Sequence, residues 1–450
     1  MATVDQWEDP NVSGTATPSQ AEPRTLLGAL RTTPTEVYVT TLIMFVAWTF
    51  VCMDLSFPGL ALPAISSSIH VSVSDLSYAL GGFAFIEFLV PLVGGRLLDR
   101  YGRRKMFSWS LIGTGVFSVL TAPVTALWQF VVVRCITAGS FGAVEPTINT
   151  HVAEQAPKRV RGLFMGFVQA GYPLGAAIAG YIASAMLAGP GWRPLFLIAF
   201  APVLVVIAVT WYTRDPARYR AARAAALEQG GDVARPGWRH LFRQGRTRQT
   251  VVGSLFGFCI NGGIGLVLGV LTAYLVKVDH LSLSNAAFLF SLSNWAALAG
   301  QLFIGWLADH VPAKWLMLVS PVLAAAAIGS LGFAGLSYGQ AMVCLVCFGF
   351  FGNGTFGCYP RYVAESYPTE YRGTGVSFVL GCSFLTLSFM PIIGGFLIDT
   401  SHVTDIAIIS GVVVACASLV MAFGRNIRPQ RELHEELLAA GPRLQPPTAQ

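Results

Sequence analysis

The sequence predicts an all-α polytopic membrane protein with twelve transmembrane helices arranged as two six-helix repeats. Three observations predict it. The composition is too apolar for a soluble protein, apolar stretches of membrane-spanning length recur along the chain, and two loop patterns each occur twice at a nearly constant offset. Helices are expected because a lipid-exposed backbone must satisfy its hydrogen bonds within each segment.

The composition excludes an ordinary soluble protein. Hydrophobic residues make up 54% of the 450 residues, charged residues only 12%, and the mean hydropathy is +0.60. Soluble domains carry about 25% charged residues. This chain therefore lacks the charges needed to cover two or three soluble domains of its length.

Twelve apolar segments are long enough to cross the hydrocarbon core, which takes about 20 residues. We expect spans over Tyr38–Leu60, Leu76–Leu98, Met106–Val124, Leu127–Thr150, Leu163–Leu187, Pro194–Thr213, Val252–Val276, Asn285–Ala308, Trp315–Leu336, Ala341–Tyr362, Gly375–Ile398 and Ile406–Phe423. They predict a cytoplasmic tail over residues 1–36, six-helix bundles over 37–213 and 249–424, a cytoplasmic linker over 214–248, and a cytoplasmic tail over 425–450.

The distribution of cations predicts the orientation. With both termini in the cytoplasm, all but three of the 29 Lys and Arg residues fall on the cytoplasmic side. The exceptions are Arg134 within a span and Arg193 and Lys277 on the other face. This bias is the positive-inside rule. The first 36 residues lack a signal-peptide pattern, so the first span should remain as an anchor in the cell inner membrane.

Neither the linker nor the cysteines indicate a nucleic-acid surface or a metal site. The linker carries nine Arg residues, which we interpret as a solvated segment beside anionic lipid rather than a nucleic-acid surface. All eight cysteines fall within apolar segments. Cys344 and Cys347 form a CxxC without a second pair, so we expect no metal site.

Two loop patterns reveal an internal duplication. The first contains Gly95, Asp99, Arg100, Gly102 and Arg103, and returns around Gly305 and Asp309, with Ala313 in place of Arg103. In the second, Glu, Pro, Arg and Gly recur at the same spacing, from Glu154 to Arg161-Gly162 and from Glu365 to Arg372-Gly373. The offsets are 210 residues from Asp99 to Asp309 and 211 from Glu154 to Glu365. Parallel repeats of this kind place a substrate site between the halves, near the bilayer midplane.

These residues carry a resemblance to the major facilitator transporters. Gly95–Lys105 resembles the loop signature between helices 2 and 3 of that superfamily. The Glu154–Gly162 and Glu365–Gly373 loops are similar to those of its sugar, sialate and aromatic-acid branches. Arg134 with Gly139, and Trp192-Arg193 with Leu195-Phe196, resemble its helix 4 and helix 6 motifs. The resemblance covers the chain after residue 36 and implies the major facilitator fold with alternating access.

The loop residues are predicted to act as gates. Asp99 can accept hydrogen bonds from helix N-termini or pair with arginines of neighbouring loops, holding one face closed in one state. The whole set of candidate gating residues comprises Gly95, Asp99, Arg100, Gly102, Arg103, Glu145, Glu154, Arg161, Asp309, Glu365 and Arg372. Glu145 belongs to it because we expect it to pair with the loop arginines.

Ionisable residues inside spans are functional candidates because burying them in lipid is costly. Asp54 lies roughly 9 Å and Arg134 roughly 10 Å from the outer ends of their spans, at about 1.5 Å per residue. Opposite charges at one depth on neighbouring helices predict an ion pair that protonation of Asp54 would break; a static pair is the alternative. Glu87, roughly 16 Å deep, is a second candidate proton site or a structural acid.

Polar uncharged residues in the spans predict a substrate pocket with aromatic walls. The candidates are Trp48, Gln169, Tyr172, Asn261, Asn294, Asn353, Tyr359, Ser383 and Thr386, with Trp295 as a further wall residue. Each is also explained by helix–helix packing.

The predicted function is proton-coupled uptake of a small organic acid by a monomer. Asp54, nine residues before Pro63-Ala64-Ile65, and Gln169–Gly175 resemble helices 1 and 5 of aromatic-acid:proton symporters, although Val51 stands where that family has an earlier Asp. The alternatives are proton-coupled sugar or sialate uptake and drug:proton antiport. A polytopic enzyme or sensor has no supporting motif. We expect no cofactor and no nucleic-acid partner, only the proton, the substrate and the bilayer.

Overall fold

The computed structural model describes residues 26–187, 189–213, 215, 238–242, 246–268, 271, 274–275, 283–332, 336–367, 372–399 and 403–426. Several predictions therefore lie outside the described residues: most of both tails, most of the linker, Lys277 and the side chain of Asp99.

The first half is built of helices only, within its described residues. They are α1 (Leu26–Thr32), α2 (Thr35–Leu60), α3 (Leu62–Ile69), α4 (Val73–Tyr101), α5 (Arg103–Val119), α6 (Leu127–Phe141), α7 (Val144–Gln155), η1 (Lys158–Val160), α8 (Arg161–Gln169), α9 (Gly171–Leu187), α10 (Arg193–Ile198) and α11 (Ala201–Tyr212).

The second half is likewise helical where described. Its helices are η2 (Trp238–Phe242), α13 (Thr247–Leu268), α15 (Leu283–Leu307), α16 (Ala313–Ser330), α17 (Tyr338–Gly352), η3 (Asn353–Gly357), α18 (Tyr359–Glu365), α19 (Arg372–Asp399) and α20 (Val403–Ala422).

The helices confirm the predicted all-α polytopic fold. Among the described residues, ten segments are long and apolar enough to cross a membrane. The shorter apolar stretch Arg193–Val209 and the 17-residue helix α5 occupy the positions of the predicted sixth and third spans. The twelve predicted spans therefore each correspond to a helical segment.

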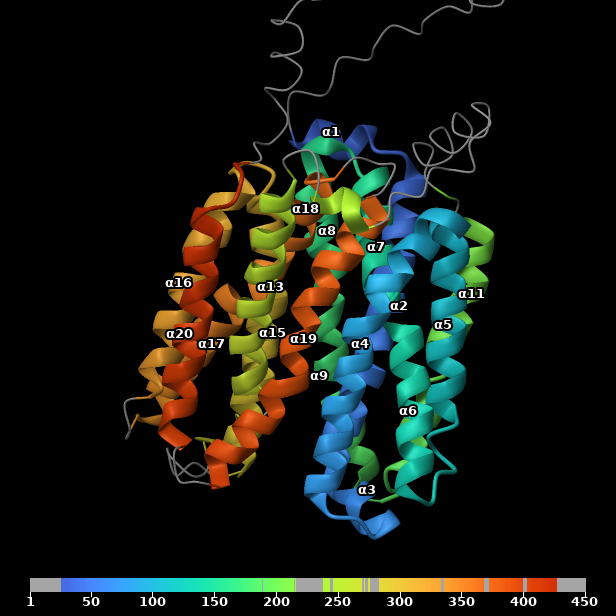
Figure 1. The fold of residues 1–450 in the computed structure, drawn as a ribbon, viewed down its shortest axis with the longest axis vertical. Coiled ribbons are helices and arrows are strands. Elements are labelled where there is room, and N and C mark those ends of the chain that lie inside the picture. Colours follow the sequence, from blue (N-terminus) through green and yellow to red (C-terminus); the bar gives the residue numbers. More distant parts are fainter. Residues whose placement is uncertain are drawn as a thin grey trace, which may run out of the picture.

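The two halves lie side by side, and a few helices join them (Figure 1). The first half (blue to green) meets the second (yellow to red) where α4 packs along α19 and where α8 and α9 pack against α15. Helices α7, α8 and α18 crowd at one end of the bundle (Figure 1). We call this end, which carries Gly102, Glu154, Asp309 and Glu365, the signature face.

The predicted repeat also appears in the backbone. The fourth span breaks between α6 and α7 at Gly142-Ala143, and the tenth breaks at η3, beginning with Asn353. The offset from Gly142 to Asn353 is 211 residues, the same as between Glu154 and Glu365. Pro146 and Pro360 lie just after these breaks, where a residue without a backbone N–H cannot complete the helical ladder.

The N-terminal region differs in detail from the polar tail predicted over residues 1–36. Helix α1 forms within it and packs on η1, and α2 already begins at Thr35. Ala29 is buried, and the Tyr38 hydroxyl donates to the Leu30 carbonyl at 2.7 Å. A short apolar run next to a span gains stability by packing on the bundle end.

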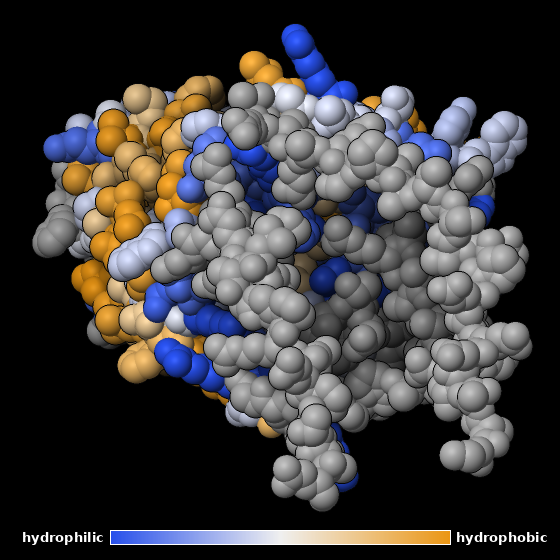
Figure 2. Space-filling model, turned by 90° about the horizontal axis from the view of Figure 1, so that it is seen from above, coloured by the Kyte–Doolittle hydropathy of each residue, from blue (hydrophilic) through white to orange (hydrophobic). Residues whose placement is uncertain are grey.

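Seen from above, hydrophilic residues gather on the signature face and apolar ones cover the flank at the left of the view (Figure 2).

Candidate functional site

The structure brings Asp54 and Arg134 into contact. Asp54 on α2 and Arg134 on α6 form an ion pair, with Nη1 at 3.3 Å from Oδ1 and 3.4 Å from Oδ2. Both residues are buried, at 1% and 5% exposure. The Ser118 hydroxyl on α5 donates a short hydrogen bond to Asp54 Oδ1, and Arg134 also stacks over the ring of Phe196. The carboxylate is thus compensated by a cation and a hydroxyl from two other helices.

Glu87 joins this pair. It is 6% exposed on α4 and lines the same small cavity as Asp54 and Arg134, together with the apolar residues Val51, Leu55, Ala138 and Phe141 and with Thr137. It lies within electrostatic range of both charged partners. Two acids thus share one arginine in a mostly apolar cavity, which makes their ionisation interdependent.

The expected pairing of Glu145 with loop arginines is wrong. Glu145, on α7 just beyond the helix break, accepts a hydrogen bond of 3.2 Å from Gln169 Nε2. This acid therefore contacts α8 and, among the described residues, forms no ion pair with the loop arginines. Tyr172 of the first half and Tyr359 of the second both lie within its electrostatic range. Glu145 therefore belongs with the polar groups between the halves.

The candidate substrate residues of the second half fall into one cluster and two outliers. Asn261 Nδ2 donates to Ser383 Oγ at 3.0 Å, and Thr386 Oγ1 donates to the Ser383 carbonyl at 2.9 Å. Tyr359 is fully buried nearby and donates to the Gly253 carbonyl. By contrast, Asn294 donates to Phe290 within its own helix, and the carbonyl of Asn353 accepts from Gln301.

The remaining aromatic candidates differ in burial. Trp48 is buried, stacks on Phe141 at 5.8 Å, and its indole Nε1 has no hydrogen-bond partner within the described part of the chain. Tyr172 is 37% exposed. Trp295, expected as a pocket wall, is 44% exposed and lies on the same helix face as the exposed Phe288 and Phe303. Helix α15 turns its buried neighbour Asn294 inward and Trp295 outward.

On the signature face, charged loops cross between the halves. Asp309 accepts the backbone N–H groups of Gly162 at 2.8 Å and Leu163 at 2.9 Å, in the first turn of α8. Arg161 lies 3.1 Å from Glu365, and Arg372 lies 3.7 Å from Glu154. A carboxylate at a helix N-terminus is stabilised by free N–H groups and the helix dipole.

Glycine allows this crossing to be tight on both sides. A Cβ added to Gly305 would lie 2.7 Å from the Gly162 carbonyl, and one added to Gly95 would lie 2.9 Å from the Gly373 carbonyl. Gly305 is the repeat counterpart of Gly95, and Gly373 of Gly162. The two contacts are therefore related by the duplication, and neither tolerates a side chain without separation of the helices.

The contact of Asp309 with α8 depends on donors that offset the burial of its charge. Burial raises the pKa of the Asp309 carboxyl above its ordinary value, while Arg361 and the two α8 amides oppose that effect. Arg361 on α18 donates to Asp309 at 2.6 Å and to Glu365 at 3.1 Å. Without such donors a buried carboxylate would tend to take up a proton.

Three residues that contact the candidate charged groups and loops were not predicted from the sequence: Ser118, Arg361 and Asp215. Asp215 accepts from the Arg104 backbone N–H at 2.9 Å, and a Cβ on Gly102, whose φ is +96°, would lie 2.9 Å from it. Arg361 offered a signal, since it lies four residues before Glu365 in an apolar segment. Ser118 offered none, because a single Ser in a span is commonplace. Arg100 points away from these contacts, exposed and over the Tyr101 ring.

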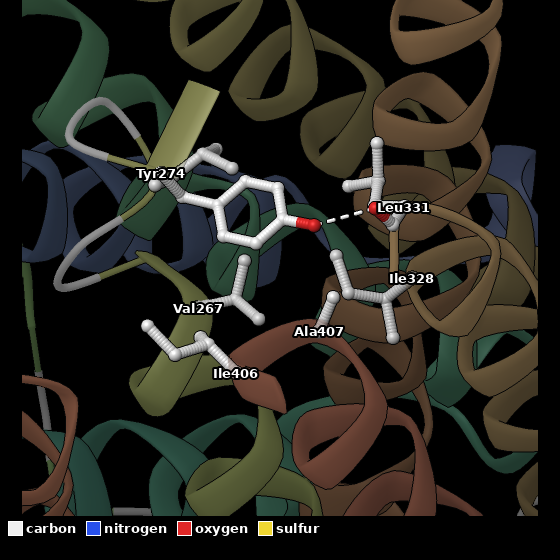
Figure 3. A pocket seen from close by; sticks show the side chains of 7 residues that line it. Val267, Tyr274, Ile328, Leu331, Ile406 and Ala407 are labelled. Carbon is white, nitrogen blue, oxygen red and sulfur yellow. Dashed lines mark hydrogen bonds between the residues drawn. The ribbon is translucent and has the colours of Figure 1, made fainter. Parts of the chain in front are cut away.

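A second cavity lies within the second half, away from these charges. Figure 3 shows the Tyr274 hydroxyl directed at the Leu331 carbonyl, with Val267, Ile328, Ile406 and Ala407 around it. Among the described residues the lining is otherwise apolar, and the Tyr274 hydroxyl already donates to a carbonyl. These lining residues offer no further polar side chain to a solute.

The comparison with protein families decides the class. The family model described as Major Facilitator Superfamily matches residues 44–296 and 253–445. The chain belongs to the major facilitator superfamily. The two matched ranges together take in both repeated halves of the chain.

Three of the relatives are named for the compound that they transport. The chain is 26% identical to the 4-hydroxybenzoate transporter PcaK of Acinetobacter baylyi, over 83% of this chain and 88% of that protein. It is 24% identical to a gallate transporter of Pseudomonas putida (76% and 81%) and 24% identical to the sialic acid transporter NanX of Escherichia coli (75% and 82%).

Among solved structures, the proton:xylose symporter XylE matches with a TM-score of 0.72 at 18% identity, covering 90% of this chain and 99% of that one. At that identity the match supports the fold alone.

Proposed function

We propose that this superfamily member is a proton-coupled symporter that takes up a small organic anion, such as an aromatic or other carboxylate. The observation that carries the proposal is the buried Asp54–Arg134 pair with Ser118 and Glu87 around one small cavity. Protonating Asp54 would release Arg134, and a released buried cation attracts an anion. Proton and anionic substrate would then load together.

The relatives support the substrate class. Hydroxybenzoate, gallate and sialic acid, named for three of them, all carry a carboxylate. The polar groups between the halves supply the remaining contacts in this proposal: Glu145 with Gln169 from one side, Asn261 and Ser383 from the other. Sugar uptake and drug:proton antiport remain the alternative hypotheses.

We further propose that the protein works in the cell inner membrane with the signature face in the cytoplasm. The cation bias of the sequence supports this orientation. Closed loop contacts on that face would belong to a state that is shut toward the cytoplasm.

The test is uptake by the full chain in proteoliposomes. Labelled 4-hydroxybenzoate, gallate, cis,cis-muconate and sialic acid are compared with neutral xylose, each under an imposed inward proton gradient. We expect a carboxylate to accumulate and a protonophore to abolish the accumulation. Accumulation of xylose alone would refute the anion class, and accumulation that follows sodium and ignores pH would refute proton coupling.

A further inference from the structure

The first half holds its loop acid with an arginine at the start of α5. Arg103 is fully buried, and its Nη2 lies 2.9 Å from Glu154 Oε1. The repeat counterpart of Arg103, 210 residues on, is Ala313. Ala313 is itself buried at 5% exposure and begins α16 as Arg103 begins α5. The second half thus lacks a cation at the equivalent position.

The second half supplies its buried cation from a different helix. Arg361 on α18, 3% exposed, donates from Nε to Glu365 at 3.1 Å and from Nη1 to Asp309 at 2.6 Å. It also donates to the Ala308 carbonyl at 2.9 Å. Its counterpart in the first half, 211 residues earlier, is the uncharged and fully buried Thr150. Each half therefore has one buried arginine for its loop acid, drawn from a different element.

The partners of Arg361 are the two acids that reach across to the first half. Asp309 accepts the Gly162 and Leu163 amides, and Glu365 lies 3.1 Å from Arg161. The Asp309 side chain is 0% exposed, so its charge needs a compensating donor within the protein. The planar guanidinium can hold two carboxylates at once in fixed directions, which a lysine cannot.

We propose that Arg361 takes over the role of the arginine missing at Ala313, as a positioning residue. It holds the Asp309 carboxylate on the Gly162 and Leu163 amides and so sets the strength of the contact between the halves. The contact then depends on whether the second half holds a buried arginine beside these acids, and not on the element that carries it. An arginine moved from α18 to the start of α16 would stand where Arg103 stands in the first half, and so beside Glu365, the counterpart of Glu154.

The experiment measures amide hydrogen exchange at Gly162 and Leu163 by mass spectrometry on the purified full chain. In Arg361→Thr we expect these amides to exchange about tenfold faster or more, because a charged hydrogen bond contributes about 1.5–3 kcal/mol and 1.4 kcal/mol corresponds to tenfold. In the double variant Arg361→Thr/Ala313→Arg, which copies Thr150 and Arg103, we expect slower exchange to return in part, because the new cation would face Glu365, which already lies beside Arg161 at the start of α8. The test needs no substrate, so it is independent of the proposed function.

The matched control is Lys314→Gln. Lys314 is a cation on α16 directly after Ala313, but it donates to the carbonyls of Ala422 and Gly424, so exchange at Gly162 and Leu163 should stay as in the unmodified protein. Unchanged exchange in Arg361→Thr would overturn the proposal. Faster exchange in Arg361→Thr that Ala313→Arg does not slow at all would also overturn the proposal, because Arg361 would then have a purely structural role. If Arg361→Thr does not fold, Arg361→Lys decides: intermediate exchange supports the proposal and unchanged exchange refutes it.

Discussion

Asp54 and Arg134 lie 80 residues apart in the chain, yet their side chains meet at 3.3 Å inside the first half. Ser118, from a third helix, donates to the same carboxylate. Burying such a pair costs desolvation free energy, and removing only one of the two partners strongly destabilises the fold. This asymmetry makes it suited to a switch in which the proton replaces the arginine as the partner of Asp54.

Asp54→Asn should abolish uphill uptake while permitting exchange of labelled for unlabelled substrate. Asparagine mimics the protonated acid, so the loaded carrier can reorient but cannot turn over protons. Uphill uptake and counterflow are measured on one purified sample in proteoliposomes. Asp75→Asn, which removes an exposed carboxylate at the start of α4, is the control and should retain both activities. Full proton-driven accumulation by Asp54→Asn would identify the pair as static.

Arg134→Ala should be more damaging than Asp54→Asn. It leaves the buried Asp54 without its cation, at a cost of about 3–5 kcal/mol, and removes the proposed anchor for a substrate carboxylate. We expect loss of both uphill uptake and exchange, with a lower melting temperature of the purified protein. Exchange at the normal rate would contradict a role of Arg134 in binding the anion.

Glu87→Gln separates a second proton site from a structural acid. Since Glu87 shares the cavity with Asp54 and Arg134, neutralising it should alter the pH dependence of uptake while the protein still folds. The measurement is the uptake rate as a function of pH in proteoliposomes. A pH profile that superimposes on that of the unmodified protein would mark Glu87 as structural.

Asp99→Asn should slow transport without weakening substrate binding. Its repeat counterpart Asp309 contacts helix N–H groups across the halves, so we expect Asp99 to set the conformational equilibrium. The uptake rate should fall, while the dissociation constant stays within about threefold, less than 1 kcal/mol. Loss of binding by a folded Asp99→Asn protein would place this residue in the binding site instead.

Much of the fold was predictable because lipid leaves the backbone few options. Apolar length located all twelve helical segments, and the spacing of the loop patterns gave the duplication. The Asp54–Arg134 pair was predicted from depth, since about 1.5 Å per residue put both charges at one level, together with the expectation that their helices are neighbours. Depth did not indicate that Ser118 is the third residue of this group, because packing decides which residue of a neighbouring helix faces Asp54.

The sequence by itself determined the helices, the repeat and the pairing of the two opposite charges buried at one depth. Only the tertiary structure decided how each helix is rotated. A helix that is apolar all round gives no preferred inward face, so Trp295 turned outward while Asn294 turned in. Packing likewise placed Glu145 against Gln169, and it brought Arg361 from α18 to an acid whose own loop has no arginine.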